Sequence, residues 1–286
     1  MIYVTGHTII DRIFHVNDFP KVNQSRPIQK YNIIHGGGAA NTAYAYKKLG
    51  HDVSLITLLG NDFSSSGYEK KIKEDGIDIS HAKFVNDQMP TAFLFNNEQK
   101  QQLMFFYWGA SSKFPEFEIP ELQITKKSVI HMATASPDFN KRISSKYSKD
   151  FLIVFDVGQD VVVYKKQDLQ EIFQNTHLLM MNDNEASEVL KRLEIKNLKE
   201  ILLLFPSIKI IVETRGPDGS YLLTREEEIY VPAMKPEKIV DTTGAGDSYK
   251  AAFIHSYLEG KDWKQCAQFA TEISTKVIQK NGPQVL

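Results

Sequence analysis

Short apolar stretches that alternate with helix-like segments constrain the fold of this chain more than any other feature. They lie at 129–133, 151–155, 177–181 and 208–212, and a segment with helical periodicity or helix-start signals follows the first three of them. Strands that are apolar throughout are buried on both faces, which is typical of parallel sheets covered by helices. The pattern therefore predicts an α/β protein with a three-layer, doubly wound and mostly parallel sheet.

The N-terminal half departs from this alternation. Residues 12–34 are β-prone and rich in turn formers, and two β-prone arms at 91–95 and 103–108 flank the polar tip 96–101. These segments predict strands outside the main layer, the second pair forming a hairpin. Its second arm is dense in aromatic residues, which could cover a ligand, contact another subunit or belong to an ordinary core.

Three further elements are expected from local signals. Residues 53–59 read as one buried strand, and a helix is expected over about 64–74, ended by Gly76. Ser136 followed by Pro137 is a typical start of a helix.

The bulk composition narrows the class of protein. The chain has 286 residues, 42% of them hydrophobic, and a net charge of −1, which argues against nucleic-acid and membrane-surface partners. A single cysteine, Cys266, excludes an internal disulfide framework, and its apolar neighbours at helical spacing indicate a core position. No stretch approaches 18 apolar residues, and Met1–Val4 lacks the basic start of a signal peptide. We therefore expect a cytoplasmic protein.

Glycines and two carboxylates come together at 241–247. Gly244, Ala245 and Gly246 stand between Asp241 and Asp247, and an amphipathic segment follows at once. Bare backbone at a helix N-terminus exposes amides to an anion, which the helix dipole also favours. Because a carboxylate would repel a phosphate, Asp247 in the first turn is expected to face a hydroxyl. The alternative is a plain glycine turn with a capping acid.

A second glycine cluster precedes another helix-like segment at 36–41. Gly36, Gly37 and Gly38 would again expose backbone amides, but Asn41 stands where a dinucleotide fingerprint needs its last glycine. Asn41 can donate and accept hydrogen bonds, which suits a sugar hydroxyl, although it could also face the turn. Asp11, just past the strand at 2–5, is a candidate ligand contact or a solvated loop acid.

Polar residues and glycines also follow the apolar strands of the C-terminal half. They are Asp156, Asn182, Glu185, Thr214 and Gly216. Since ligands of parallel sheets bind beyond the carboxyl ends of the strands, we expect these residues to share one edge with 241–247.

The combined set describes phosphoryl transfer from a nucleotide to an alcohol. It contains an anion cradle, a carboxylate facing a hydroxyl, and acidic or amide residues suited to a hydrated Mg²⁺. Asn182 and Glu185 fit contacts to the water molecules of that ion. Neither a Walker A motif nor the protein-kinase motifs occur, and the cysteine and histidines lack zinc spacing.

These residues resemble the motifs of the ribokinase-like (PfkB) carbohydrate and nucleoside kinases. Residues 241–247 are similar to the family signature D-T-x-G-A-G-D, and 36–41 match its G-G-x-x-x-N. Asn182 with Glu185 matches N-x-x-E, and the run from Thr214 to Gly219 matches T-x-G-x-x-G. The motifs span nearly the whole chain in the family's order.

The resemblance implies a role for each matching residue. Asp247 would take the proton of the substrate hydroxyl, and Gly244, Ala245 and Gly246 would form the anion hole for the phosphoryl group. The sugar hydroxyls would be bound by Asp11, Gly36, Gly37 and Asn41, and ATP by Asn182, Thr214, Gly216 and Gly219. Asn182 and Glu185 would hold Mg²⁺ through water. A monovalent cation, often K⁺, would lie near Asp241 and Thr243.

The resemblance also implies an architecture. One domain, 1–286, would carry a small β-sheet lid formed by about 11–35 and 91–110, which in relatives closes over the sugar and often joins two subunits into a homodimer. Two departures stand out. Lys250 stands two residues past a position where relatives usually place a small or aromatic residue. The short stretch after Gly282 suggests that a final helix is missing or shortened.

Within the family, the chain is most similar to archaeal-type broad-specificity nucleoside kinases, which phosphorylate the 5′-hydroxyl of nucleosides. The similar segments are 6–11, 36–41, 106–110, 156–160 and 246–249. Phe106 and Gln159 would then contact the substrate. Ribokinase or another simple sugar kinase is the nearest alternative, while few basic residues in the lid arms disfavour a phosphosugar substrate. A non-catalytic nucleoside or nucleotide sensor is a third alternative, which the intact Asp247 and its glycines disfavour.

Overall fold

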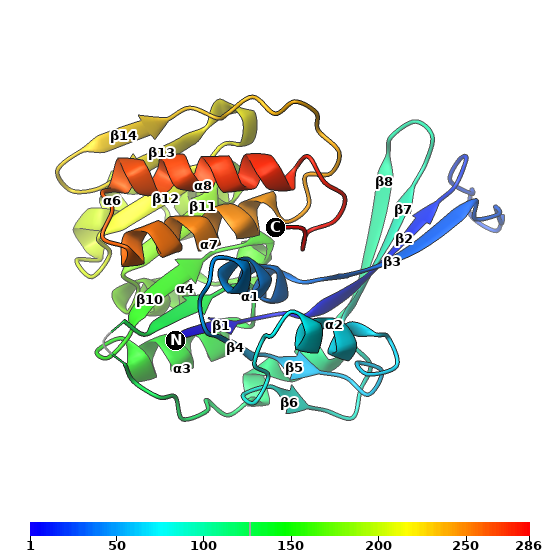
Figure 1. Cartoon of the computed structure of the whole chain (residues 1–286), viewed down its shortest axis with the longest axis horizontal. Helices are drawn as coiled ribbons and strands as arrows, with labels where there is room; N and C mark the ends of the chain where they lie inside the picture. Colours follow the sequence, from blue (N-terminus) through cyan, green and yellow to red (C-terminus); the bar gives the residue numbers. More distant parts are fainter. Residues whose placement is uncertain (126) are drawn as a thin grey trace.

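A computed structural model describes residues 1–125 and 127–286 and contains an eight-stranded main sheet (Figure 1). The strand order is β14-β13-β12-β11-β10-β9-β1-β4, and every neighbouring pair from β12 to β4 is parallel. The pairs β12–β13 and β13–β14 are antiparallel, so the expected mostly parallel sheet is confirmed. The strands are β1 Ile2–Thr5, β4 Val53–Ile56, β9 Val129–Met132, β10 Leu152–Asp156, β11 Leu178–Asn182, β12 Ile210–Thr214, β13 Ser220–Leu223 and β14 Glu228–Val231.

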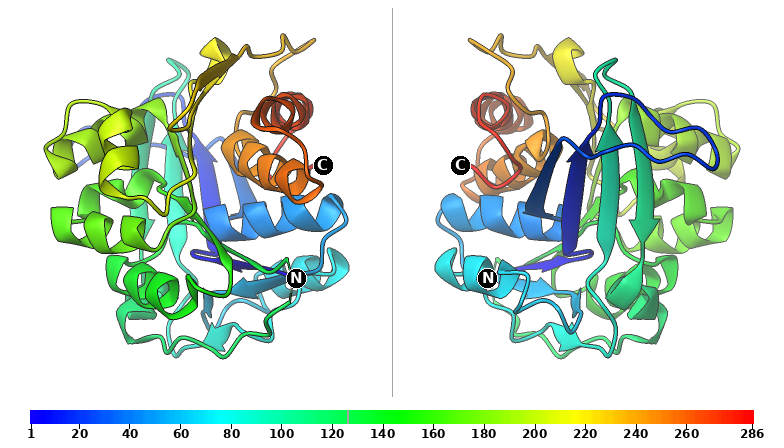
Figure 2. Two further views of the ribbon diagram at one scale, coloured as in Figure 1. Left: turned by 90° about the vertical axis from the view of Figure 1, so that its left-hand side faces the viewer. Right: turned by 90° about the vertical axis from the view of Figure 1, so that its right-hand side faces the viewer.

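Helices cover both faces of this sheet and complete the three layers (Figure 2). One buried cluster joins α1, α7 and α8 to one face, and a second joins α3, α4, α5 and α6 to the other. In the described ranges, no helix has the length and apolar character needed to cross a membrane. The α-helices are α1 Gly38–Lys48, α2 Tyr68–Glu74, α3 Pro137–Tyr147, α4 Lys166–Gln174, α5 Asp183–Leu193, α6 Leu198–Leu204, α7 Ala245–Leu258 and α8 Trp263–Val277, and the 3₁₀ helices are η1 Gly109–Glu116, η2 Gln159–Val163 and η3 Gly216–Asp218.

Local sequence signals explain several helix starts and core positions. The Ser136 hydroxyl accepts a hydrogen bond from the backbone N–H of Phe139, and Pro137 opens α3, as expected. Asp262 caps α8 in the same way through Gln265. Cys266 is buried in α8, which confirms its predicted core position.

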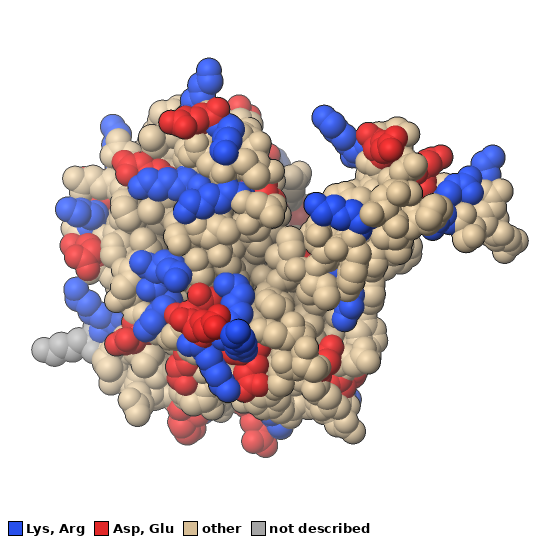
Figure 3. All heavy atoms as spheres, turned by 45° about the vertical axis from the view of Figure 1, so that its right-hand side comes forward, with Lys and Arg blue, Asp and Glu red and all other residues tan. Residues whose placement is uncertain are grey.

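A second sheet projects from the body where the lid was predicted, and we refer to this sheet as the lid (Figures 1 and 3). Its strands are β2 Ile9–His15, β3 Lys30–Gly36, β7 Thr91–Asn96 and β8 Gln102–Tyr107, in the order β3-β2-β7-β8. The predicted hairpin is β7–β8, while β2 pairs with β7 in parallel. β2 follows directly after β1, and β3 leads directly into α1. The lid is therefore attached to the body next to the carboxyl end of β1.

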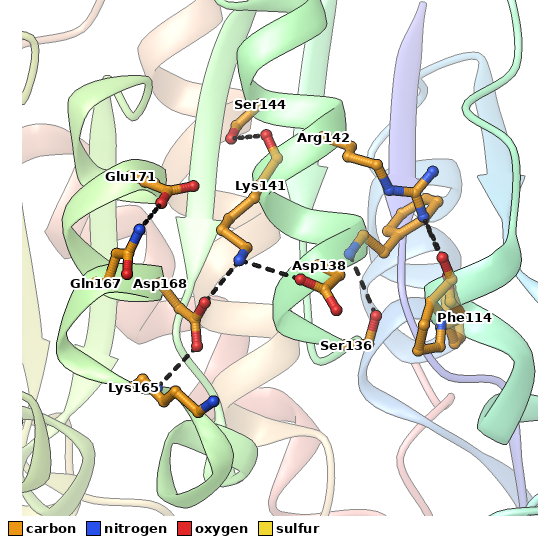
Figure 4. A network of polar contacts seen from close by, with 12 residues as sticks. Phe114, Ser136, Asp138, Lys141, Arg142, Ser144, Lys165, Gln167, Asp168 and Glu171 are labelled. Atoms are coloured by element: carbon orange, nitrogen blue, oxygen red, sulfur yellow. Dashed lines mark hydrogen bonds and ion pairs between the residues drawn. The ribbon is translucent and has the colours of Figure 1, made fainter.

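The base of the lid is fastened to the body through η1, which follows β8. The Arg142 guanidinium on α3 donates hydrogen bonds to the backbone carbonyls of Phe117 (2.8 Å) and Pro115 (2.9 Å), so it satisfies the end of η1. It also donates to the carbonyl of Phe114 at 3.3 Å (Figure 4). Lys141 beside it pairs with Asp168 on α4 at 2.7 Å. The connection is therefore held by side chains on the body.

Two predicted elements were wrong in their bounds. The expected strand 53–59 ends at Ile56, and Leu58–Leu59 form β5, which pairs with β6 (Lys83–Phe84) in a separate two-stranded sheet. The chain leaves the main sheet at Thr57, whose hydroxyl accepts a hydrogen bond from Thr8. The helix expected over 64–74 begins only at Tyr68, because Gly67 before it is left-handed with φ of 81°.

Candidate active site

The signature residues 241–247 form a loop that ends at the N-terminus of α7. Gly244 is the residue before the helix, with φ of 76°, a conformation that side-chain-bearing residues rarely adopt. The first amides of α7, at Ala245 and Gly246, have no carbonyl within the helix to bind, and the Ala245 N–H donates instead to the carbonyl of Thr242 at 3.3 Å. Backbone amides at a helix N-terminus are suited to an anion. The backbone here fits the predicted anion cradle, which stays a prediction.

Asp241 holds this loop together. One carboxylate oxygen accepts hydrogen bonds from the backbone N–H (2.9 Å) and the hydroxyl (2.7 Å) of Thr243, and the other accepts from the N–H of Gly282 at 3.0 Å. These contacts connect the loop to the C-terminal segment. Asp241 and Thr243 are also oxygen donors of the kind that a monovalent cation would use.

The glycine turn at 36–38 lies against both of the carboxylates that the sequence singled out. A Cβ on Gly36 would stand 2.6 Å from an oxygen of Asp11, and one on Gly38 would stand 3.9 Å from an oxygen of Asp247. Asp11 comes from β2 of the lid and Asp247 from α7 of the body. One bare turn therefore separates a carboxylate of the lid from a carboxylate of the main domain.

Asn41 joins Asp247 to the C-terminal segment. Its amide nitrogen donates a hydrogen bond to Asp247 at 2.9 Å, and its amide oxygen accepts one from Gln284 at 3.0 Å. Gln284 also donates to the hydroxyl of Tyr68, which in turn donates to the carbonyl of Gly36 at 2.7 Å. Sequence reasoning did not find Gln284 or Tyr68, since neither lies in a motif.

Both carboxylates have altered acidity. Burial raises the pKa of Asp247 to about 6, and Lys250 and the Asn41 hydrogen bond limit that rise. Burial likewise raises the pKa of Asp11 to about 6. A carboxylate of this pKa remains ionised at neutral pH yet accepts a proton more readily than an ordinary aspartate, which suits a general base.

The other predicted residues lie at the same edge of the sheet, where β10, β11 and β12 end. Asn182 is paired in register with Thr214, and Asp156 with Met180 two residues before Asn182. Gly216 and Gly219 follow in the turn around η3, and a Cβ on Gly219 would stand 2.3 Å from the carbonyl oxygen of Val231. The strand-end rule thus placed these residues together.

Asn182 and Glu185 form a capping box at the start of α5. The Asn182 side chain accepts from the N–H of Glu185 at 2.8 Å, and the Glu185 carboxylate accepts from both nitrogens of Asn182 at 2.9 and 2.8 Å. Burial raises the pKa of Glu185, whereas Lys250 opposes this change. Within 1–125 and 127–286, no group of three or more histidine, cysteine or acidic side chains could hold a metal by itself. Carboxylate oxygens retain free lone pairs, so this pair fits Mg²⁺ through water rather than as a closed cage.

Lys250 was left without a role by the sequence, and the structure places it inside the protein. Its ammonium group forms an ion pair with Asp156, and only 9% and 4% of the two side chains are exposed. The surrounding residues of α7, such as Tyr249 and Ala251, are buried as well. A lysine within such an apolar run was the available signal that it has a buried partner.

The remaining predicted residues are Phe106, on β8 of the lid, and Gln159, in η2 of the body. Phe106 packs edge-on against Trp108, with ring centroids 4.7 Å apart, and Gln159 is exposed at the start of η2. His7, which the sequence did not single out, connects these parts. One ring nitrogen lies 2.9 Å from the Ser111 hydroxyl in η1 and the other 3.3 Å from an oxygen of Asp160 in η2.

Known proteins of one family resemble this chain along its whole length. The family model of the pfkB family carbohydrate kinases matches residues 1–286. The nucleoside kinase of Methanocaldococcus jannaschii is 35% identical over 98% of this chain and 90% of the relative, and that of Methanothermobacter thermautotrophicus is 35% identical over 98% and 89%.

Solved structures show the same architecture. The crystal structure of the M. jannaschii enzyme, described as an archaeal member of the ribokinase family, matches with a TM-score of 0.93 over 99% of this chain and 93% of that chain. A Thermotoga maritima ribokinase matches with a TM-score of 0.85 at 22% identity over 99% and 94%, which shows the shared fold. The predicted ribokinase-like fold, family resemblance and kinase class are confirmed, and this chain belongs to the pfkB family of carbohydrate kinases.

Proposed function

We propose that this protein is an ATP-dependent kinase that phosphorylates the 5′-hydroxyl of nucleosides. The observation that carries the proposal is the glycine turn at 36–38, which lies between Asp11 of the lid and Asp247 of α7. A ribose fits this arrangement when its vicinal hydroxyls reach Asp11 and its 5′-hydroxyl reaches Asp247. The two archaeal relatives that are 35% identical are named nucleoside kinases, which favours a nucleoside over a free sugar.

The residues divide the reaction between them. Asp247 accepts the proton of the 5′-hydroxyl as that oxygen bonds to the γ-phosphorus of ATP, and the bond from phosphorus to ADP breaks. The amides at Gly244, Ala245 and Gly246 stabilise the negative charge on the transferring group. Hydrated Mg²⁺, held through Asn182 and Glu185, would neutralise phosphate charge. Thr214, Gly216 and Gly219 line the ATP side, and a monovalent cation such as K⁺ would rest on Asp241 and Thr243.

The lid side of the site would receive the base. Phe106 and Trp108 offer aromatic surface, and exposed Gln159 offers an amide that can donate and accept hydrogen bonds. Ribokinase activity is the second candidate, because Asp11 and Asn41 would serve any vicinal diol.

A substrate panel tests the proposal directly. The purified protein is incubated with ATP and Mg²⁺ and with adenosine, guanosine, inosine, cytidine, uridine, ribose or fructose 6-phosphate, and ADP formation is followed. We expect phosphorylation of one or more nucleosides with kcat/KM well above that for ribose. Preference for ribose would assign the second candidate, and no phosphorylation of any acceptor would contradict the assignment as a kinase of this class.

Asp11→Ala should weaken nucleoside binding. A carboxylate that accepts hydrogen bonds from two hydroxyls contributes about 1.5–3 kcal/mol for each charged hydrogen bond, so we expect nucleoside KM to rise by about 10²-fold or more. The KM for ATP should remain within about twofold, because the donor pocket lies at the ends of β11 and β12. Steady-state kinetics with each substrate varied in turn provides the measurement.

The matched control is Asp18→Ala, an exposed aspartate in the loop between β2 and β3. It should leave both KM values unchanged. A rise in the KM for ATP alone in Asp11→Ala would show that the sugar site has been misplaced.

We also propose that two copies associate through their lids. The outer strand β8 exposes Leu103, Met104 and Phe105, and Phe105 has 61% of its surface accessible. Exposed apolar residues on an edge strand favour pairing with another sheet. Sedimentation velocity should give about twice the 32.6 kDa chain mass for the wild type and the monomer for Phe105→Lys. Leu203→Lys, at an exposed position on α6, is the control that should remain dimeric, and a monomeric wild type would refute the proposal.

A further inference from the structure

Lys250 and Asp156 form a buried ion pair beside the proposed reaction centre. Lys250 lies one helical turn after Asp247 on α7, so both side chains lie on neighbouring parts of one helix face. Asp156 ends β10, beside the strand that leads to Asn182 and Glu185. The ion pair therefore stands between the element that carries the base and the strand that precedes the Mg²⁺ residues.

Several acidic side chains act on Lys250 at once. Three carboxylates from three elements, Asp156, Glu185 and Asp247, act on its ammonium group and favour its charged form. Buried carboxylates that share one region disfavour each other's ionisation, unless a positive charge compensates. Lys250 supplies that charge from within the protein.

Among the described residues, the other side chains near Lys250 carry no positive charge that could compensate these carboxylates. On β9, His131 is fully buried, its ring nitrogen lies 2.8 Å from the Tyr46 hydroxyl of α1, and burial lowers its pKa to about 4. His131 is therefore neutral at physiological pH, and burial raises the pKa of Tyr46, which is neutral too. On α7 itself, Ser248 and Tyr249 carry no charge.

We propose that Lys250 is a positioning residue whose fixed charge, aimed by Asp156, keeps Asp247 ionised before Mg²⁺ and ATP bind. This inference rests on the proposed role of Asp247 as the base. It assigns opposite effects to the two members of one ion pair. Lys250 favours the carboxylate form of Asp247, and Asp156 disfavours it, as expected for charges of opposite sign near the same group.

The experiment measures the protonation of Asp247 in wild type, Lys250→Met, Asp156→Asn and the double variant. Carbon-13 carboxyl NMR of the free enzyme between pH 4 and 8 reports the pKa of Asp247, with Asp247→Asn identifying its signal. In Lys250→Met we expect the midpoint to lie at least about one pH unit higher, since a nearby opposite charge changes a carboxyl pKa by about 1–3. In Asp156→Asn it should lie lower than in the wild type.

The same order should appear in catalysis. Below its pKa Asp247 is protonated and cannot accept the hydroxyl proton, so kcat/KM, which reports the pKa values of the free enzyme, falls on the acidic side of about pH 6 in the wild type. This limb should lie at higher pH in Lys250→Met, at lower pH in Asp156→Asn, and between the two in the double variant. At pH 6 the single lysine variant should lose at least about fivefold more kcat/KM than it loses at pH 8.

The controls separate a structural role from the proposed one. Loss of activity with an unchanged Asp247 midpoint in Lys250→Met and Asp156→Asn would overturn the inference, because the pair would then serve only packing. If Lys250→Met does not fold, Asp156→Asn still decides, since a midpoint equal to or above the wild-type value contradicts it. A wild type that phosphorylates none of the acceptors would refute the proposed function, whereas the NMR midpoints test Lys250 without catalysis.

Discussion

Asp247→Asn is expected to lower kcat by about 10²–10⁴-fold while nucleoside affinity changes little. The asparagine side chain has the same shape, but its amide cannot accept the proton of the 5′-hydroxyl at neutral pH, and general-base catalysis contributes about that factor. Because the lost interaction forms only in the transition state, kcat and kcat/KM should fall together. Stopped or coupled assays of ADP formation give kcat, and calorimetry gives the nucleoside Kd.

Two further measurements distinguish loss of the base from loss of the folded structure. The Asn41 amide, which donates to Asp247 at 2.9 Å, can still donate to the carbonyl oxygen of an asparagine, so the variant should retain the wild-type Tm within a few degrees. The residual activity should also lose its acidic limb near pH 6, since the titrating group is absent. Near-normal turnover would refute Asp247 as the base, and a nucleoside Kd weakened as much as kcat would assign it to binding.

The main sheet could be predicted because its strands satisfy a simple physical condition. Stretches such as 151–155 and 177–181 are apolar without interruption, which only a sheet covered on both faces can bury. The bend at Thr57 could not be predicted in the same way. Leu58 and Leu59 are as apolar as the residues of β4, and only their pairing with β6 shows that they left the main sheet.

The site could be predicted where one short segment carries its own chemistry. Glycines before a helix with Asp247 in its first turn indicate an anion cradle beside a carboxylate, whatever the rest of the chain does. Contacts between distant segments could not be predicted from the sequence. Gln284 reaches Asn41 across most of the chain, and Lys250 reaches Asp156 across about a third of it, so neither pairing leaves a local pattern.

Asn182 and Glu185 show how one pair of residues satisfies two demands. The capping box that they form is a sufficient structural reason for both residues at that spacing. It also fixes the Glu185 carboxylate at the strand edge, where a hydrated cation beside a phosphate would need it. A sequence pattern cannot separate these roles, because the cap and the proposed metal contact require the same side chains.

Gly244→Ala should damage both stability and turnover. The backbone at Gly244 has φ of 76°, which costs a residue with a side chain about 1–2 kcal/mol, and the new Cβ would stand 2.7 Å from the Cα and carbonyl oxygen of Pro283. Relief of that contact requires the loop or the C-terminal segment to move, and this would displace the amides of the anion hole. We expect kcat to fall about 10²–10³-fold, as for loss of one oxyanion donor, together with a lower Tm.

Gly260→Ala is the matched control at the other end of the same helix. Gly260 has φ of 81°, but nothing lies within 4 Å of the position that its Cβ would occupy. This variant should therefore carry the same backbone strain, with a Tm lowered by several degrees, and keep the wild-type kcat. If Gly244→Ala also kept its kcat, the bare backbone at 244–246 would be needed for the turn alone, and the anion hole would have to be sought elsewhere. If both variants lost turnover equally, the loss would follow from strain in α7 rather than from contact with Pro283.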